Sequence, residues 1–206
     1  MTSKRDSILE ASAKAIAERG VRGLRVNDVA EYAGVSPGLL YYHFSDRAGL
    51  LGAALHFVNE RARSYRGASV DNDDSPRTRL EAQLLDEFQD DPLVIENSRA
   101  WEELRSSAIF EEELRAPVAR STVEWVAEIA DGIIDAQESG EVAASVDPHR
   151  AALALSIFME GLDGRWLCEE LPTADIRDLM SDALTQVLGA APAKKKKTAT
   201  TGRSTK

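Results

Sequence analysis

Cysteine is almost absent from this chain, which has Cys168 as its single thiol among 206 residues. One thiol cannot form an internal disulfide, and it does not supply the thiolates of a structural metal cluster. No apolar run approaches the length of a membrane span, and residues 1–15 lack the continuous apolar core of a signal peptide. We therefore expect a cytoplasmic protein with neither a membrane nor a metal as partner.

Catalytic motifs are also missing from the sequence. The histidines, His43, His56 and His149, lie far apart. There is no glycine-rich phosphate loop followed by Lys-Ser or Lys-Thr, no Gly-x-Ser-x-Gly sequence and no Cys-x-x-Cys pair. We expect that the protein is not an enzyme and needs no cofactor. The alternative, a helical enzyme or binding protein whose residues converge only in the fold, would show no DNA affinity at low salt.

The net charge of −10 is distributed unevenly. Residues 1–66 hold 10 basic and 7 acidic side chains, residues 67–188 hold 9 and 28, and residues 189–206 hold 6 and none. A basic segment attached to an acidic one suits a protein that contacts phosphates with one end only. Residues 191–206, with four consecutive lysines, are expected to be a disordered tail that either adds salt-sensitive DNA affinity or is simply solvated.

The stretch VNDVAEYAGVSPGLLYYHFSDR, residues 26–47, has the pattern of two short helices joined by a tight turn. We expect the first helix over residues 28–33, with Asn27 as its N-cap. Gly34 should end it, because glycine adopts the left-handed conformation that a helix end commonly needs.

A second helix should begin at Pro37, because Ser36 is a good helix cap and proline suits the first helical position. Over about eight residues it is roughly 12 Å long, which matches a DNA major groove about 12 Å wide. Its inner side, expected to pack on the first helix, consists of Leu40, Tyr41 and Phe44. Its outer side, which can meet base edges, consists of Gly38, Leu39, Tyr42 and His43. Ser45 is expected to cap the following helix, and Arg47 to bind a phosphate.

The run Gly-Val-Ser-Pro-Gly-Leu-Leu-Tyr-Tyr-His-Phe, followed by an acid, a base and then Leu50, closely resembles the DNA-binding domain of the tetracycline-repressor-type (TetR-type) transcriptional regulators. The resemblance is specific over residues 7–55 and continues as helix number and spacing to about residue 188. It implies DNA binding through this helix-turn-helix, dimerisation through the last two helices and control by a small molecule. Family members usually have lysine where this chain has Arg47, and both side chains can hold a phosphate.

The apolar periodicity predicts an all-α protein. We expect an N-terminal three-helix DNA-binding domain over residues 1–50 and a larger C-terminal helical domain for ligand binding and dimerisation over residues 51–190. The helix 46–66 links the two, and the resemblance implies that its displacement carries the ligand signal. Other helices are expected over residues 5–19, 77–89, 92–106, 109–139, 148–169 and 173–188. Pro117 should kink or restart the long helix, and Thr173 should cap the last one.

The segments 148–169 and 173–188 are apolar over more than one stripe, which exceeds what a surface helix of a monomer needs. We expect them to pair with the same segments of a second copy in a four-helix bundle. Such a homodimer would set two reading helices about 34 to 36 Å apart, or a multiple of that, on a palindromic operator in double-stranded DNA. The alternative is a monomer with a large buried core.

The acidic part of the chain carries large aromatic residues on helices that can face one another. We expect a pocket for a small-molecule effector, with Trp101, Phe110, Trp125 and Phe158 as candidate wall residues. Rings near Glu102 or Glu160 would suit a cation, and a hydrophobic or acyl ligand would fit almost as well. For each ring taken singly, ordinary core packing is the alternative.

These patterns, together with the resemblance to the TetR-type regulators, favour a dimeric, sequence-specific DNA-binding transcriptional regulator, which the resemblance implies is a repressor that a small-molecule ligand releases. Its candidate DNA-binding residues are Asn27, Ser36, Pro37, Gly38, Leu39, Tyr42, His43 and Arg47. Base contacts would come from the second helix, whereas Asn27, Ser36 and Arg47 would position it on the DNA backbone. The alternative is a constitutive architectural DNA-binding protein, which would show weak sequence preference and no response to a ligand.

Overall fold

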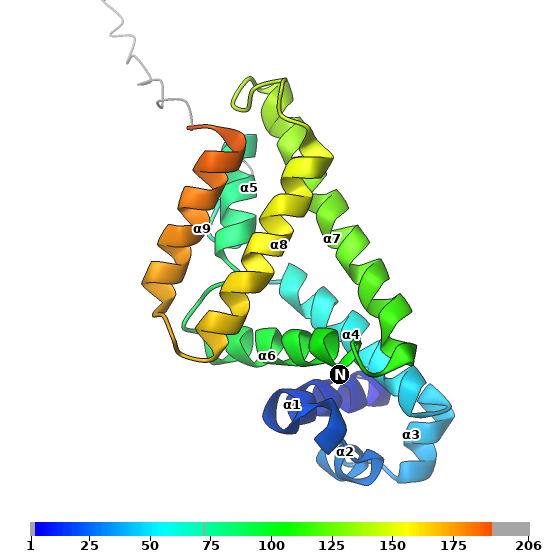
Figure 1. Cartoon of the computed structure of the whole chain (residues 1–206). Helices are drawn as coiled ribbons and strands as arrows, with labels where there is room; N and C mark the ends of the chain where they lie inside the picture. Colours follow the sequence, from blue (N-terminus) through cyan, green and yellow to red (C-terminus); the bar gives the residue numbers. More distant parts are fainter. Residues whose placement is uncertain (1–2, 72, 191–206) are drawn as a thin grey trace, which may run out of the picture.

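The computed structural model describes residues 3–71 and 73–190, and within them every regular element is an α-helix (Figure 1). The all-α prediction is therefore confirmed for this part of the chain, while the expected tail over residues 191–206 lies outside it. In chain order the helices are α1 (Lys4–Gly23), α2 (Val26–Tyr32), α3 (Pro37–Phe44), α4 (Arg47–Arg63), α5 (Pro76–Leu85), α6 (Pro92–Ser107), α7 (Glu112–Glu138), α8 (Pro148–Leu167) and α9 (Thr173–Leu188). None of these helices is both long and apolar enough to cross a membrane.

Several helices begin where the sequence supplies a cap followed by proline. Ser36 accepts a hydrogen bond from the Leu39 amide at the start of α3. Ser75, Asp91 and Asp147 have the same role at α5, α6 and α8. The side-chain oxygen satisfies an amide that has no partner within the helix, and proline loses no hydrogen bond at this position. These local signals therefore predict helix starts correctly.

Two expected caps before α4 are wrong. The helix α2 starts one residue before Asn27, with extended Arg25 at the cap position and no side-chain cap, so Asn27 lies within the first turn. At α4, Asp46 and not Ser45 accepts a hydrogen bond from the Gly49 amide, at 2.8 Å. Ser45 instead forms the turn between α3 and α4 with a positive φ of 61°.

Two details of the later helices also differ from expectation. Pro172 occupies the cap position of α9, which begins at Thr173 itself. The Thr173 hydroxyl accepts a hydrogen bond from the Trp166 ring nitrogen, at 2.9 Å. Pro117 lies inside α7, which runs as one helix from residue 112. The proline stands early in this helix, so a single missing backbone hydrogen bond does not divide it.

Buried side chains form two clusters. The lower cluster joins α1, α2, α3 and α4 to the second half of α6 and the start of α7, and the upper cluster joins α5, α7, α8 and α9 to the first half of α6. The residues of α6, α7 and their connection that enter the lower cluster are Ala100, Leu104, Ala108 and Leu114. The helix α1 packs against α6 (Figure 1) and also contacts α2, α3 and α4. Through α1, the position of the short helices α2 and α3 therefore depends on α6 as well as on α4.

Gly49 lies where α4 passes close to the end of α3. A Cβ at this position would lie 2.3 Å from the Phe44 carbonyl oxygen, closer than such atoms approach. Gly49→Ala is therefore expected to destabilise the protein by about 1 to 3 kcal/mol, the usual cost of overpacking, as measured by urea unfolding. The matched control is Gly38→Ala, whose Cβ would meet only Ser36 Oγ, at 3.9 Å. Equal stability of the two variants would contradict this account.

Candidate nucleic-acid interface and ligand cavity

The helix α3 has one buried side and one exposed side. Leu40 is fully buried and Phe44 is 5% exposed, because these side chains, four residues apart, share one face of the helix and enter the lower cluster. Tyr42, on the opposite side, is 82% exposed. The expectation that Tyr41 packs inward is wrong, since one helical step from Leu40 leaves its ring 48% exposed.

The candidate DNA-binding residues of α3 gather at one end of the molecule (Figure 1). Ser36, Pro37, Gly38 and Tyr42 are exposed, and Leu39 and His43 are partly exposed. The Tyr42 and His43 rings make an edge contact with 5.4 Å between their centroids. A phenol and an imidazole side by side offer both donors and acceptors, which base edges and phosphates require. This face has the chemistry and the exposure to enter a DNA groove.

Asn27 and Arg47 flank this face in different ways. Asn27 is exposed on α2, so its side-chain amide is accessible to a DNA backbone. The Arg47 guanidinium donates to Glu111 and to the Val21 carbonyl oxygen, in each case at 2.8 Å. Arg47 therefore joins α4 to α1 and to the connection before α7, and a phosphate would have to compete with Glu111 for it. The sequence pattern did not predict this contact.

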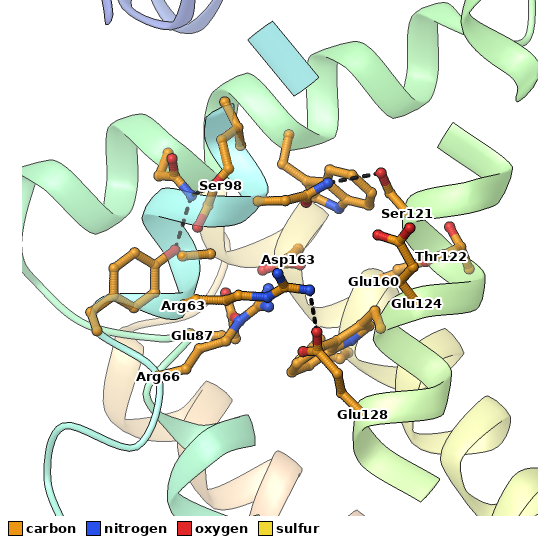
Figure 2. A pocket seen from close by; sticks show the side chains of 18 residues that line it. Arg63, Arg66, Glu87, Ser98, Ser121, Thr122, Glu124, Glu128, Glu160 and Asp163 are labelled. Carbon is orange, nitrogen blue, oxygen red and sulfur yellow. Dashed lines mark hydrogen bonds and ion pairs between the residues drawn. The ribbon is translucent and has the colours of Figure 1, made fainter. Parts of the chain in front are cut away.

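A cavity of about 50 Å³ lies among α4, α6, α7 and α8 (Figure 2). Its apolar walls include two of the expected aromatic residues, Trp101 and Trp125, together with Val58, Ala62 and Met159. Because α4 and α6 supply part of the wall, a molecule bound here would touch the two helices that support α2 and α3.

The other two aromatic candidates lie elsewhere. Phe110 is 73% exposed, and Arg22 lies 5.4 Å from its ring centroid. It is outside the cavity because α6 ends at Ser107, so Phe110 belongs to the connection that reaches back toward α1. Phe158 is 41% exposed, since the following residues of α8, Met159 and Glu160, are the ones that face the cavity. The expected wall of four aromatic residues is thus corrected to two.

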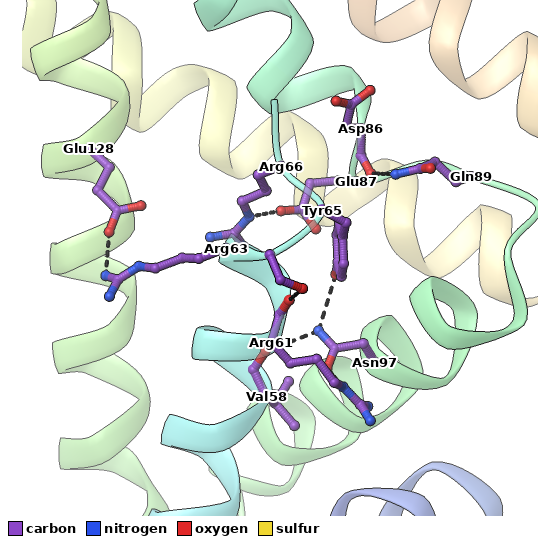
Figure 3. A network of polar contacts seen from close by, with 11 residues as sticks. Val58, Arg61, Arg63, Tyr65, Arg66, Asp86, Glu87, Gln89, Asn97 and Glu128 are labelled. Atoms are coloured by element: carbon purple, nitrogen blue, oxygen red, sulfur yellow. Dashed lines mark hydrogen bonds and ion pairs between the residues drawn. The ribbon is translucent and has the colours of Figure 1, made fainter. Parts of the chain in front are cut away.

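More acids than bases line this cavity. The acidic residues are Glu87, Glu124, Glu128, Glu160 and Asp163, and the basic ones are Arg63 and Arg66. Ion pairs join Arg63 to Glu128 and Arg66 to Glu87 (Figure 3). Arg105 lies 3.6 Å from Glu160, but it also pairs with Glu102. The surplus of carboxylates favours a positively charged occupant over an anion.

Asp163 is a buried acid in the wall of this cavity. Burial raises the pKa of this carboxyl well above its usual range, and nearby acids raise it further while Arg105 opposes them. Those acids are Glu87, Glu102 and Glu160. The Oδ1 atom of Asp163 is buried and has no hydrogen-bond partner among the described residues. A neutral carboxyl at this place can donate as well as accept a hydrogen bond.

The charged residues of the cavity wall were not predicted from the sequence, because two of them were placed in the wrong secondary structure. Arg66 and Glu87 lie in the turns after α4 and α5, which the apolar pattern assigned to helix. One available signal was the pair Glu160 and Asp163, which stand three residues apart on one face of the largely apolar segment 151–163. Acids on an apolar helix face indicate a buried polar site.

Asp163→Asn is expected to stabilise the protein at neutral pH, because it removes a buried group whose ionisation opposes folding. The pKa of Asp163 is higher in the folded chain than in the unfolded one, where it is about 4. The wild type therefore loses stability as pH rises from that value through the folded pKa. Thermal unfolding should show an advantage of the variant that grows from about pH 4 upward. Asp182→Asn, an exposed change on α9, is the control, and an advantage that shrinks with rising pH would refute the assignment.

Two family models match the chain. Residues 8–54 match a model described as bacterial regulatory proteins of the tetR family, and residues 76–189 match the C-terminal model of BetI-type transcriptional repressors. The first range contains α2 and α3, and the second contains all of α6, α7 and α8.

Known transcriptional regulators are similar to this chain over most of their length. The regulator TtgR of Pseudomonas putida, an HTH-type transcriptional regulator, is 31% identical over 182 residues, which cover 86% of this chain and 85% of TtgR. A crystal structure from Rhodococcus sp., assigned to the TetR-family transcriptional regulators, is 57% identical with a TM-score of 0.87, over 91% of this chain and 100% of that chain.

A structure from Saccharomonospora viridis, described as a transcriptional regulator in complex with choline, has the same fold. Its identity is 24% and its TM-score is 0.75, over 89% of this chain and 96% of that chain. Because the family models and the relatives span both the helix-turn-helix and the helical body behind it, this chain belongs to the TetR family of transcriptional regulators.

Proposed function

We propose that the protein is a dimeric, sequence-specific DNA-binding repressor that a small-molecule ligand releases from its operator. The observation that carries this proposal is the exposed face of α3, on a helix whose other face is anchored by buried Leu40 and Phe44. In this proposal residues 1–50 bind DNA and residues 51–190 bind the ligand and dimerise, with residues 46–66 shared between the two.

The helix α3 enters the major groove. Its eight residues extend about 12 Å at 1.5 Å per residue, which is the width of the groove. Tyr42 and His43 meet base edges or nearby phosphates, and Leu39 lies against a thymine methyl group. Gly38 allows a close approach, because it presents no side chain on the exposed face. Pro37, the first residue of α3, enters the groove with the rest of the helix. The residues that position α3 on the DNA backbone are Asn27, Ser36 and, when its pair with Glu111 opens, Arg47.

Dimerisation uses the apolar surface that α8 and α9 leave exposed. Its large side chains are Leu153, Ile157, Phe158 and Leu179, between 39% and 61% exposed. On α8, Ala154 and Gly161 stand three or four residues from Ile157 and Phe158, so small residues allow a second helix to approach this stripe. Each Å² of such surface removed from water contributes about 25 cal/mol. A homodimer through residues 148–169 and 173–188 would place two α3 helices on a palindromic operator.

The ligand acts by changing the separation of the two α3 helices. Trp101 of α6 lines the cavity, and Glu103, two residues further on, binds the Val21 amide of α1 at 2.9 Å. A ligand that displaces α6 therefore also displaces α1, and one that displaces α4 moves the helix that follows α3 directly in the chain. A ligand releases DNA only through its difference in affinity for the bound and the released arrangement.

Tyr42→Ala is expected to lower discrimination between operator and random DNA, because a base contact is lost while phosphate contacts stay. Wild-type and variant proteins would each select fragments of genomic DNA at near-physiological salt. The wild type should enrich a short palindrome, and the variant should lose about 1 to 3 kcal/mol of preference for it. Sequence-blind recovery by both proteins would favour the architectural alternative, and equal loss on both DNAs would make Tyr42 a positioning residue.

Ile157→Glu is expected to dissociate the dimer, because it places a charge in the centre of the paired α8 and α9 helices. Sedimentation should then show a monomer near 22.5 kDa and the wild type near twice that mass. The matched control is Val123→Glu on α7, an equally exposed apolar position outside the proposed interface, which should leave the dimer intact. A monomeric wild type, or dissociation by both changes, would contradict the proposed interface.

A further inference from the structure

Arg66 is held between an aromatic ring and a buried acid. It follows α4 in a turn, where its amide donates to the Ala62 carbonyl oxygen at 3.1 Å. Its guanidinium carbon lies 3.9 Å from the centroid of the Trp125 ring, and its Nε atom pairs with Glu87 (Figure 3). The Arg66 and Glu87 side chains are only 15% and 10% exposed. An aromatic face beside a carboxylate is a binding site for a cation, and here the chain supplies that cation itself.

Arg66 also stands between two cavities. The inner cavity, described above, has about 50 Å³, and an outer cavity bordered by the turn after α4 and by α5 has about 360 Å³. The residues that line both are Arg63, Arg66 and Glu128. Arg63 pairs with Glu128, so the wall between the cavities consists of arginine–glutamate pairs (Figure 3). Movement of the Arg66 side chain would join the two spaces.

The inner cavity has polar atoms that its own walls leave unsatisfied. Among the described residues, Trp125 Nε1 and Asp163 Oδ1 are buried without a hydrogen-bond partner. Buried polar atoms of a native protein are normally paired, so such atoms mark a place where a ligand group binds. The unpaired donor suits an acceptor on the ligand, such as a hydroxyl or carbonyl oxygen.

We propose that the inner cavity binds an organic cation, which takes the place of the Arg66 guanidinium between Trp125 and Glu87. This inference rests on the proposed function, in which a small molecule controls DNA binding, and it names the chemistry of that molecule. The displaced Arg66 side chain moves into the outer cavity, where Asp71 offers another carboxylate. The polar end of the ligand meets Trp125 Nε1 and Asp163.

The size of the cavity requires this exchange. A water molecule occupies about 30 Å³ in the liquid, and sites for small molecules usually have about 300 to 1,000 Å³. The inner cavity, at about 50 Å³, is therefore too small for an organic ligand beside the Arg66 side chain. The exchange gives the ligand the space that the Arg66 guanidinium leaves, while the outer cavity of about 360 Å³ takes up the displaced side chain.

The exchange gives the ligand a direct effect on α4. Arg66 lies three residues beyond the end of α4, and the other end of α4 begins at Arg47, next to α3. While Arg66 is stacked on Trp125 and paired with Glu87, the turn after α4 is fixed to α7 and to the turn after α5. Its displacement removes both contacts, so α4 can shift and change the position of α3.

Isothermal titration calorimetry with choline as the probe tests the exchange without DNA. Arg66→Ala removes the internal competitor for the site. The apparent affinity is the intrinsic affinity multiplied by the fraction of molecules whose site is accessible, and Arg66 keeps this fraction small in the wild type. We therefore expect Arg66→Ala to bind choline at least about tenfold more tightly than the wild type. Arg66→Met is the matched control, since it also removes the charge but keeps the space filled, and it should show no such gain. Circular dichroism establishes that each variant is folded.

A second comparison uses the wild type alone, so its result does not depend on the folding of a variant. The alcohol 3,3-dimethylbutan-1-ol has the shape of choline without its charge. We expect choline to bind at least about tenfold more tightly than this alcohol. Equal binding of the two probes, equal gains in Arg66→Ala and Arg66→Met, or failure of folded Arg66→Ala to bind choline would each overturn the proposal.

These titrations also separate the cation site from the proposed function. Choline binding with the expected preferences, in a protein that selects no DNA palindrome, would support the site and overturn the regulatory role. Selection of a palindrome by a protein that binds neither probe would support the regulatory role and overturn the cation site.

Discussion

The packing of α1 on α6 holds the DNA-binding helices on the rest of the protein, and the bond from the Val21 amide to the Glu103 carboxylate, 2.9 Å long, fixes its polar edge. This bond forms because Gly20 interrupts α1 with a positive φ of 73°, which turns the next amide toward α6. A Cβ on Gly20 would be strained and would lie 2.8 Å from Glu103 Oε1, so only glycine suits this place. Arg47 adds a second tie through the Val21 carbonyl oxygen and Glu111. One short segment of α1 thus anchors α2 and α3 to the helical body.

The other end of α6 is attached to α4 at the cavity. Asn97 donates to the Val58 carbonyl oxygen and to the Tyr65 hydroxyl, each at 3.1 Å, and accepts from Arg61 at 2.7 Å. Two of the four helices that line the cavity therefore also support α2 and α3. One is α6, through the bond from Glu103 to α1 and the shared buried cluster, and the other is α4, which follows α3 directly in the chain. This arrangement supplies the connected element through which two distant sites can bias one equilibrium. It also explains why a single buried cluster contains both α1 and half of α6.

The helices could be predicted from short-range signals in the sequence, whereas most of the residues that line the cavity could not. A cap such as Ser36 or Asp147 acts on an amide two or three residues away, so a few residues suffice to recognise it. The second helix of the helix-turn-helix was recognised in this way. The two tryptophans of the cavity were predicted on a different ground, as large aromatic residues on helices that can face one another. The carboxylates bound by Arg47 and Arg66 stand 64 and 21 residues away, and apolar periodicity carries no information about such pairs. Phe110 was assigned to the cavity by the same criterion as the tryptophans and is exposed, because it lies in the connection between α6 and α7 and not on a helix.

The central claim is that two copies of α3 read DNA at a spacing set by the helical body, and the distance between protomers measures it directly. A spin label at Glu31→Cys, an exposed position on α2, in a Cys168→Ser background would give this distance in the complex with selected DNA by double electron–electron resonance. The account predicts a narrow distribution corresponding to α3 helices about 34 to 36 Å apart, or a multiple of that. Absence of a signal between protomers, or a distance that fits no whole number of DNA turns, would contradict it.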